Sequence, residues 1–414
     1  MHIINIGNEL LLGKTINTNA AFIAEKVADA GIKVEKLIVI ADEPERIIDT
    51  ISNCFKETDW IITTGGLGPT KDDMTKNAIA KYFNVGFEMH SPTLEAVVTM
   101  FTDRGLEAGE INRKQAEIPM GALVLPNKNG TAPGIWMEKN GKTLIALQGV
   151  PFEMQPILLE SVIPLLKEKY KGIQGIAHKS FLTCGIGESA LAHLLENWEN
   201  ALPKHLSLAY LPSPGQVILR ISAQAAEKSA AMQMIDEQTP SLLEIITPYL
   251  VTTEEETLVE IVSTLLKKNK KTLAIAESCT GGYLSHLITS LPGSSQFFEG
   301  SIVSYSNVVK RDILNVREQN LKKHGAVSEM VVTDMAINVM SLFETDYTIA
   351  TSGIAGPGGG TVEKPMGLVW VAVATPTRVV TQKFLFGKNG GREIIIKKAA
   401  SSALNMLRKE IMKD

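Results

Sequence analysis

Hydrophobic and polar positions along the first part of the chain follow two alternating patterns, which predict strands and helices in turn. Short runs rich in Val and Ile at His2–Gly7, Val34–Ile40 and Trp60–Gly66 predict strands. Between them, amphipathic spacing predicts helices over Thr18–Ala30 and Glu43–Glu57. Strands that alternate with helices in this way predict a parallel sheet covered on both faces, as in an α/β domain.

Two later runs predict a β-hairpin within the same domain. Gly134–Lys139 and Lys142–Leu147 are joined by Asn140-Gly141, a pair that favours a tight hairpin turn. A long amphipathic helix from Phe152 to about Lys169 then closes a first domain, which we place at residues 1–170.

The middle of the chain predicts a small α+β domain over residues 171–253. Its expected elements are a strand at Lys179–Cys184, a helix at Glu188–Trp198, two strands around Pro212–Gly215 and a helix near Ala226–Ile246. The charged stretch Thr252–Glu256 is typical of a linker or a helix start, and a third αβ domain then occupies residues 254–414.

Composition is consistent with a soluble, cytoplasmic, multidomain protein. The 414 residues are too many for one compact core and predict two or three domains. A formal net charge of −4 gives no electrostatic case for nucleic acid or a membrane surface as a partner. The N-terminus lacks the features of a signal peptide, and no apolar run approaches the ~18 residues of a membrane span. The three cysteines are scattered and form no CxxC, which predicts a reduced compartment without a structural zinc site.

The segment around Ser278 has the pattern of a nucleophile at a strand-to-helix turn. A strand over Lys271–Ala276 running into a helix over Gly281–Thr289 leaves unpaired backbone N–H groups, which can stabilise an oxyanion. Tyr305 and Lys310 follow downstream. A serine and a lysine without an obvious histidine suggest a serine amidase whose base is an amine. Such a lysine needs burial or a nearby cation to lower its pKa from about 10.4.

Other interpretations of the same residues stay open at this level. Ser278 could be only a helix N-cap, and Cys279 could be the nucleophile, since a thiol at a helix N-terminus is acidified. The histidines that would assist a cysteine, His286 and His324, are weakly placed. Lys310 would ordinarily be a solvated lysine and Tyr305 an ordinary strand aromatic. Glu277 could order the turn as a hydrogen-bond acceptor.

A glycine-rich segment in the first domain, Gly65–Thr75, follows a strand and opens a helix. Its glycines allow backbone amides to approach an anionic ligand at the helix start. Asp72 and Asp73 would repel a phosphate unless a hard cation such as Mg²⁺ lay between them, and Glu9 and Asp42 at other strand ends could join them. A metal-bridged pyrophosphate fits this set. The alternative is that Asp72 and Asp73 only cap the helix.

Several of these motifs together resemble the CinA family (competence/damage-inducible protein A). The resemblance spans essentially the whole chain in the family's order and rests on Gly65–Asp73, Asn129–Gly134, Gly149–Met154, Ala276–Gly282 and Gly353–Pro357. It implies an α/β protein with an N-terminal molybdopterin-binding-like three-layer αβα domain, a small KH-like α+β middle domain and a C-terminal αβα deamidase domain. One departure is Gln148, where the family pattern has Pro before Gly-Val-Pro.

For the N-terminal domain the resemblance implies a metal-dependent ADP-ribose pyrophosphatase, which converts ADP-ribose to AMP and ribose 5-phosphate. The cofactor would be Mg²⁺, with or without K⁺. The expected metal ligands are Asp72, Asp73, Glu9 and Asp42. The expected substrate contacts are Asn8, Gly65, Gly66, Gly68, Thr70, Asn129 and Gly130.

For the C-terminal domain the resemblance implies a cofactor-free nicotinamide mononucleotide deamidase. Ser278 would be the nucleophile, Lys310 its base, and Tyr305 a phenol that shuttles the proton or holds the lysine. The expected substrate contacts are Thr280, Gly281, Gly282, Ser352, Gly353, Ala355, Gly356 and Arg392, the last suited to a 5′-phosphate.

The partners expected from the resemblance and from composition are small nucleotides and a second copy of the chain. A KH module binds RNA through a basic Gly-x-x-Gly loop, whereas Gly185–Glu188 is mis-spaced and acidic, so no nucleic acid is expected. The alternative to a bifunctional enzyme is a nucleotide- or pterin-binding scaffold in which one or both sites are inactive.

Overall fold

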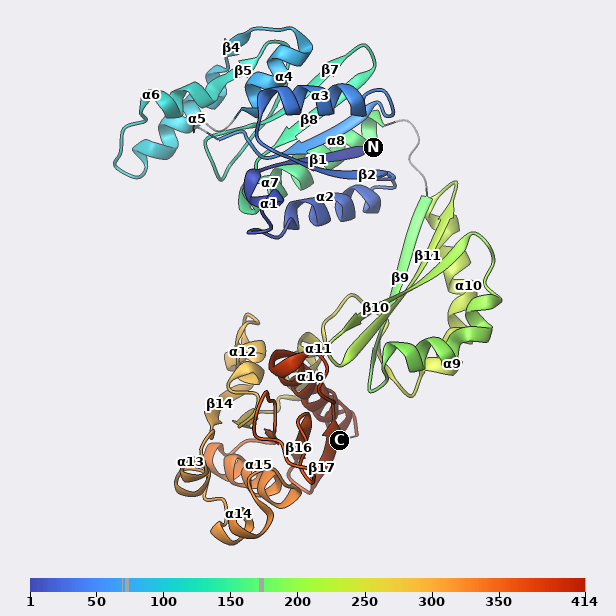
Figure 1. The fold of residues 1–414 in the computed structure, drawn as a ribbon, viewed down its shortest axis with the longest axis vertical. Coiled ribbons are helices and arrows are strands. Elements are labelled where there is room, and N and C mark those ends of the chain that lie inside the picture. The colour runs from blue at the N-terminus through green and yellow to red at the C-terminus, as the bar shows by residue number, and fades with distance from the viewer. Residues whose placement is uncertain (69, 71–73, 171–174, 414) are drawn as a thin grey trace. The chain divides into compact units, whose positions relative to one another are not determined.

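The computed structural model describes residues 1–68, 70, 74–170 and 175–413 (Figure 1). Contacts between residues divide the chain into two compact units. The first comprises Met1–Ala177 with Gln224–Ala231, and the second comprises His178–Ala223 with Met232–Asp414. None of the helices in the described ranges is both long and apolar enough to cross a bilayer.

A six-stranded sheet forms the centre of the N-terminal domain. Its order is β2 (Lys36–Ile40), β1 (His2–Ile6), β3 (Trp60–Thr64), β8 (Lys142–Leu147), β7 (Gly134–Lys139) and β6 (Leu123–Leu125). The first four strands are parallel, which confirms the parallel sheet expected from the first three. The hairpin β7–β8 has the predicted bounds, and its turn residues Asn140 and Gly141 have φ of 53° and 75°. The chain therefore reverses there, and β7 and β6 are antiparallel to their neighbours.

Helices cover both faces of this sheet and make a three-layer domain (Figure 1). On one face, α3 (Pro44–Cys54) and α4 (Thr75–Phe83) contribute Ile47, Ile51 and Ile79 to a cluster with Ile4 and Ile61. On the other, α2 (Thr18–Asp29), α7 (Pro151–Ile157) and α8 (Ile163–Lys169) pack on Ile3, Ile62 and Ile145. Neighbouring residues of one strand thus enter opposite layers, as the alternation of side chains along a strand requires.

The long helix expected over Phe152–Lys169 is interrupted. A π-helical turn over Leu158–Val162 separates α7 from α8. Pro156 lies inside α7, and Pro164 follows in the first turn of α8. Because proline has no N–H to donate, it removes a bond of the regular ladder, and the π turn accommodates the mismatch.

The remaining elements of this domain are short and lie along the chain between the main ones. They are α1 (Asn8–Leu11), the two-stranded sheet of β4 (Phe87–Met89) and β5 (Glu117–Pro119), α5 (Ser91–Thr102), α6 (Glu110–Arg113) and the 3₁₀ turn Lys114–Ala116.

The middle module is a four-stranded sheet with two helices, in keeping with a KH-like α+β domain. The sheet order is β10 (Leu206–Ser213), β11 (Gln216–Ala225), β9 (Gly175–Cys184) and β12 (Leu250–Thr252). The helices are α9 (Glu188–Asn200) and α10 (Lys228–Ile246). The strand predicted at Lys179–Cys184 begins four residues earlier than expected.

The C-terminal domain is a second three-layer arrangement around a five-stranded sheet. Its order is β14 (Phe298–Val303), β13 (Leu273–Glu277), β15 (Tyr347–Gly353), β16 (Leu368–Ala374) and β17 (Val379–Leu385). β13 is parallel to both of its neighbours, whereas β16 and β17 are antiparallel.

Side chains alternate along β13 into the two layers of this domain. Leu273 and Ile275 pack with α11 (Leu258–Asn269), α12 (Tyr283–Thr289) and α16 (Gly391–Ile411), whereas Ala274 and Ala276 pack with α15 (Glu329–Phe343). Two short helices, α13 (Asn307–Asp312) and α14 (Glu318–His324), and the 3₁₀ turn Ser294–Gln296 complete the domain.

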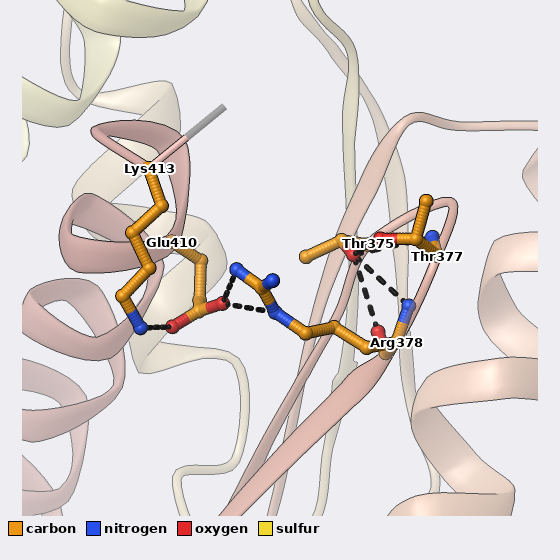
Figure 2. Close-up of polar contacts among 5 residues, drawn as sticks. All are labelled: Thr375, Thr377, Arg378, Glu410 and Lys413. Atoms are coloured by element: carbon orange, nitrogen blue, oxygen red, sulfur yellow. Dashed lines mark hydrogen bonds and ion pairs between the residues drawn. The ribbon is translucent and has the colours of Figure 1, made fainter.

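The last turn of α16 is tied to the turn between β16 and β17 by charged side chains (Figure 2). One carboxylate oxygen of the buried Glu410 accepts from Arg378 Nε at 2.8 Å and from Arg378 Nη2 at 2.6 Å. Lys413 donates to the other oxygen. The Thr375 hydroxyl oxygen accepts from the N–H of Arg378 at 3.2 Å, which closes the turn that carries the arginine.

Candidate active site and a second cavity

Ser278 lies directly after β13, at the edge of the sheet where parallel strands end. Its N–H donates to the carbonyl oxygen of Thr351 in β15 at 3.0 Å, which continues the strand pairing one residue beyond β13. The two glycines that follow, Gly281 and Gly282, have φ of 61° and 97°, a region that favours glycine. They allow the chain to turn sharply into α12 while Ser278 stays at the sheet edge.

Lys310 projects from α13 to the same point, and its side chain is only 1% exposed. Its Nζ lies 2.9 Å from Ser278 Oγ, 2.5 Å from the Ser304 carbonyl oxygen and 3.4 Å from the Tyr305 carbonyl oxygen. α13 is held in place by its N-cap, Ser306, whose hydroxyl accepts from the N–H of Val309 at 3.2 Å. The predicted serine and lysine are therefore brought together, 32 residues apart in the chain.

Burial gives this lysine the property that a base needs. Removal from water disfavours the ammonium form and lowers the pKa of Lys310 to about 8. A neutral amine has two N–H bonds and one lone pair. The carbonyl oxygens of Ser304 and Tyr305 can accept hydrogen bonds from the two N–H groups. The lone pair is then available to accept the hydroxyl proton of Ser278.

Burial has the opposite effect on the pKa of Cys279. Its side chain is buried in the hydrophobic cluster on the α12 face of the sheet. Burial raises the pKa of the Cys279 thiol to about 12, so it stays protonated near neutral pH. The geometry favours Ser278 over Cys279 as the nucleophile, because only Ser278 contacts a base.

The turn after Ser278 also holds a candidate donor for an oxyanion. The N–H of Gly281 donates to the Ser278 carbonyl oxygen at 3.2 Å, and the N–H of Gly282 donates to Glu277 Oε2 at 2.9 Å. Among the described residues, the Thr280 N–H makes no backbone hydrogen bond of this kind. It lies two residues after the nucleophile and is therefore a candidate donor to a developing negative charge.

Tyr305 is near Lys310, but its phenol is directed elsewhere. Only its main-chain carbonyl approaches the lysine; its side chain is 59% exposed, and its hydroxyl oxygen accepts from Arg392 Nη2 at 2.7 Å. Arg392 Nη1 donates to the carbonyl oxygen of Gly356 at 3.0 Å. The structure thus groups the phenol with the expected phosphate-binding arginine, at the start of α16.

Among the other residues expected to contact the C-terminal substrate, the two with hydroxyl groups, Thr280 and Ser352, form hydrogen bonds to other parts of the protein. The hydroxyls of Thr280 and Thr351 are hydrogen-bonded at 2.7 Å, and the Ser352 hydroxyl donates to the Ala326 carbonyl oxygen at 2.7 Å. Gly353 ends β15, and Ala355 belongs to the hydrophobic core.

A cavity of about 620 Å³ lies at the ends of the strands in the N-terminal domain. Residues predicted as ligand contacts line it, namely Asn8, Gly65, Gly66 and Gly68, together with the predicted metal ligands Glu9 and Asp42. Thr70 is exposed. Asp72 and Asp73 lie outside the described residues.

Asn129 and Gly130 lie beside this cavity, next to an acidic residue that the sequence did not single out. Glu153 lines the cavity and accepts from Asn127 Nδ2 at 2.7 Å. A Cβ atom added to Gly130 would lie 2.0 Å from Glu153 Oε2, so a larger residue there would require the Glu153 side chain to move. Asn129 Nδ2 donates to the Phe152 carbonyl oxygen at 3.0 Å.

Gln148 has a more specific place than its sequence position suggested. It lines the same cavity, is 4% exposed, and its Nε2 donates to the Ala132 carbonyl oxygen at 2.6 Å. Its Oε1 is buried and has no hydrogen-bond partner among the described residues. The sequence drew attention to Gln148 only because it departs from the family pattern. The burial of its side chain and its hydrogen bond to Ala132 follow from the fold.

The described residues contain no group of three or more His, Cys, Asp or Glu side chains that could hold a metal ion. Three carboxylates, those of Glu9, Asp42 and Glu153, line the cavity, but they do not come together as such a group. The metal ligand set therefore stays a prediction that depends on Asp72 and Asp73.

Comparison with known proteins gives the same domain order. Residues 2–168 match the family model of a probable molybdopterin binding domain, residues 178–252 the damage-inducible protein CinA KH domain, and residues 255–411 the CinA C-terminal domain. A CinA-like protein of Flavobacterium psychrophilum is 42% identical over 414 residues, which cover 100% of this chain and 98% of the relative. The chain belongs to the CinA family.

Other members of the CinA family are similarly close. A CinA-like protein of Cytophaga hutchinsonii is 40% identical over 409 residues, covering 99% of this chain and 97% of that protein. The crystal structure of competence damage-inducible protein A from Klebsiella pneumoniae covers 37% of this chain and 95% of its own, with 34% identity and a TM-score of 0.36. The matches to CinA-like proteins over nearly the whole chain confirm the family resemblance of the sequence motifs.

Proposed function

We propose that the C-terminal domain of this CinA-family protein hydrolyses nicotinamide mononucleotide to nicotinate mononucleotide and ammonia. The observation that carries the proposal is the 2.9 Å contact between Lys310 Nζ and Ser278 Oγ, made by a buried lysine whose pKa is lowered to about 8. A serine paired with a neutral amine is an activated nucleophile. The family resemblance supplies the substrate.

The positions of Ser278 and Lys310 support the following reaction. Ser278 Oγ attacks the carboxamide carbon as Lys310 accepts the hydroxyl proton, and the resulting oxyanion is stabilised by the Thr280 N–H. The Lys310 ammonium then protonates the amide nitrogen, the C–N bond breaks, and ammonia leaves an ester on Ser278. Water attacks this ester with Lys310 again as base, which releases the carboxylate and restores the serine.

Arg392 is the residue that would recognise the phosphate of the nucleotide. It lies at the start of α16, and its guanidinium is held by the Gly356 carbonyl and the Tyr305 hydroxyl. A planar guanidinium can bind two phosphate oxygens at once. A substrate phosphate bound there would also contact the Tyr305 phenol.

The direct test is ammonia release from nicotinamide mononucleotide by the full chain and by Ser278→Ala, without added metal. We expect the variant to lose at least about a thousandfold in kcat, because the covalent route is removed. Ser290→Ala, at an exposed serine after α12, is the matched control and should keep wild-type turnover.

Unimpaired turnover by Ser278→Ala would remove Ser278 from the mechanism. If wild-type protein bound the nucleotide without releasing ammonia, the alternative of a nucleotide- or pterin-binding scaffold would be favoured instead.

For the N-terminal domain we propose hydrolysis of ADP-ribose to AMP and ribose 5-phosphate. The supporting observation is the cavity of about 620 Å³ that combines the glycines 65, 66 and 68 with Glu9 and Asp42. Backbone amides of the glycine loop would bind the pyrophosphate, and the carboxylates would face a cation. A divalent cation such as Mg²⁺, when bound, would neutralise the charge that develops on the phosphates.

This second activity is tested by AMP formation from ADP-ribose with and without a chelator. Asp73→Asn should abolish metal-dependent hydrolysis, whereas Asp49→Asn, at an exposed position of α3, should not change it. Full activity of chelator-treated wild-type protein would contradict the role of the metal.

A further inference from the structure

Glu277 is a fully buried carboxylate immediately before the nucleophile, with 0% exposure. Its Oε2 accepts from the N–H groups of Gly282 at 2.9 Å and Leu284 at 3.2 Å. Its Oε1 accepts from the N–H of Ser285 at 2.9 Å and from the Ser285 hydroxyl at 2.5 Å. All four donors belong to the end of the turn and the start of α12.

The main chain of the same residue connects to the base. The Glu277 carbonyl oxygen accepts from the Ser304 N–H at 2.7 Å, and the Ser304 carbonyl oxygen accepts from Lys310 Nζ at 2.5 Å. The side chain of Glu277 is therefore hydrogen-bonded to the segment that follows the nucleophile. Its main-chain carbonyl is hydrogen-bonded to Ser304, whose own carbonyl accepts from Lys310.

A buried carboxylate is costly unless its lone pairs are satisfied. Here four donors satisfy it, and each bond fixes one point of the chain beyond the turn. The carboxylate thereby binds the N–H groups of Gly282, Leu284 and Ser285. A glutamine could not replace it, because its NH₂ group would face a backbone N–H.

We propose that Glu277 is a positioning residue for Ser278. Its carboxylate fixes the turn of residues 279–282 against α12, so that Ser278 Oγ stays within reach of Lys310. The inference rests on the proposed hydrolytic function only for the identity of the substrate. The fixed turn itself can be measured through the reactivity of Ser278.

The test compares wild type, Glu277→Gln and Ser285→Ala in the full chain, with Glu299→Gln at an exposed position of β14 as the control. Three quantities are measured: the melting temperature, kcat and KM for nicotinamide mononucleotide, and the rate of Ser278 labelling by a fluorophosphonate, followed by mass spectrometry. In the labelling step the Ser278 Oγ–P bond forms, the P–F bond breaks, fluoride leaves, and Lys310 accepts the serine proton.

We expect Glu277→Gln to lower kcat and the labelling rate about 100-fold, comparable to the loss of one oxyanion donor, while KM changes less than about threefold. Ser285→Ala removes one of the four donors and should lower both rates by a smaller factor, about threefold to tenfold, without lowering the melting temperature by more than about 4 °C. Glu299→Gln should match wild type in every measurement.

A folded Glu277→Gln protein that labels at the wild-type rate would overturn the inference. If that variant does not fold, Ser285→Ala decides: slower labelling at an unchanged melting temperature supports positioning, and unchanged labelling contradicts it. Wild-type protein that labels at Ser278 but releases no ammonia would refute the proposed substrate and leave the positioning role standing, provided that Glu277→Gln labels slowly. Wild-type protein that does not label at Ser278 would overturn the inference, because no activated serine would be there to position.

Discussion

At the scale of single residues, burial changes the pKa values of two neighbouring side chains in the site, Lys310 and Cys279, in opposite directions. Burial lowers the pKa of Lys310 to about 8 and raises that of Cys279 to about 12, because in both cases the charged form loses hydration. The lysine can thereby lose its proton near neutral pH, whereas the thiol keeps its proton there. One physical effect thus separates the two candidate nucleophiles, since Ser278 contacts an amine that begins to lose its proton near neutral pH, whereas the Cys279 thiol keeps its own.

The pKa of Lys310 predicts the pH dependence of ammonia release. Only the neutral amine accepts the proton, so the active fraction rises with pH, from ~10% at pH 7 to about half at pH 8. We expect kcat/KM to rise about tenfold per pH unit below pH 7, about fivefold between pH 7 and 8, and to level off above pH 8, measured between pH 5.5 and 9.5.

Lys310→Arg provides the comparison for that profile. Its guanidinium stays protonated throughout this range, so the variant should be inactive at every pH. A wild-type profile that is flat from pH 6 to 9 would contradict the role of Lys310 as base.

At the scale of secondary-structure elements, the site depends on where strands end and on what holds the surrounding helices. Ser278 follows directly after β13, Lys310 lies on α13, and Arg392 lies in the first turn of α16. The far end of α16 is tied to the β16–β17 turn by Glu410 with Arg378 and Lys413 (Figure 2). This contact fixes the C-terminal end of α16, the helix whose first turn carries Arg392, the proposed phosphate-binding residue.

Arg378→Ala should therefore destabilise the protein. It leaves the buried Glu410 with one cationic partner in place of two, and because Arg378 is itself half-exposed we expect a loss of about 2 kcal/mol rather than the full cost of a broken buried pair. In the full chain this corresponds to a melting temperature lower by roughly 4–8 °C for the affected transition, measured by calorimetry.

The matched control for this prediction is Arg311→Ala. Arg311 pairs with Asp312 at an exposed position, where ion pairs contribute little to stability, so its melting temperature should stay near that of wild type. Equal effects of the two substitutions would show that burial of Glu410 is not the cause.

At the scale of the whole molecule, the two proposed reactions belong to different compact units. Each site is built from its own sheet, with Ser278 after β13 and the glycine loop after β3. We expect Ser278→Ala to leave AMP formation from ADP-ribose at the wild-type rate. A chelator should in turn leave ammonia release unchanged. Loss of both activities on either treatment would contradict independent sites.

The resemblance to the CinA family also predicts a homodimer. Multi-angle light scattering of the purified chain should give twice the 44.9 kDa mass of one copy. A mass of one copy at micromolar concentration would contradict this expectation.

The sequence by itself determined the elements whose signals are local. The Asn140-Gly141 turn and its two strands have the predicted bounds, because a two-residue hairpin turn fixes its own register. The glycines after Ser278 likewise marked a sharp strand-to-helix turn, since few other residues accept their φ angles. By contrast, the π turn at Leu158–Val162 was missed, because the apolar pattern continues across it.

Only the tertiary structure decided the chemistry of the site. No local pattern shows that Lys310 is buried against Ser278, that the Tyr305 phenol binds Arg392, or that Glu153 and the unpaired Gln148 oxygen border one cavity. Hydrogen-bond partners and pKa values depend on desolvation and on residues far apart in the chain, and these are set when the layers pack. The motifs therefore indicated which residues to examine, and the fold assigned what each of them contacts.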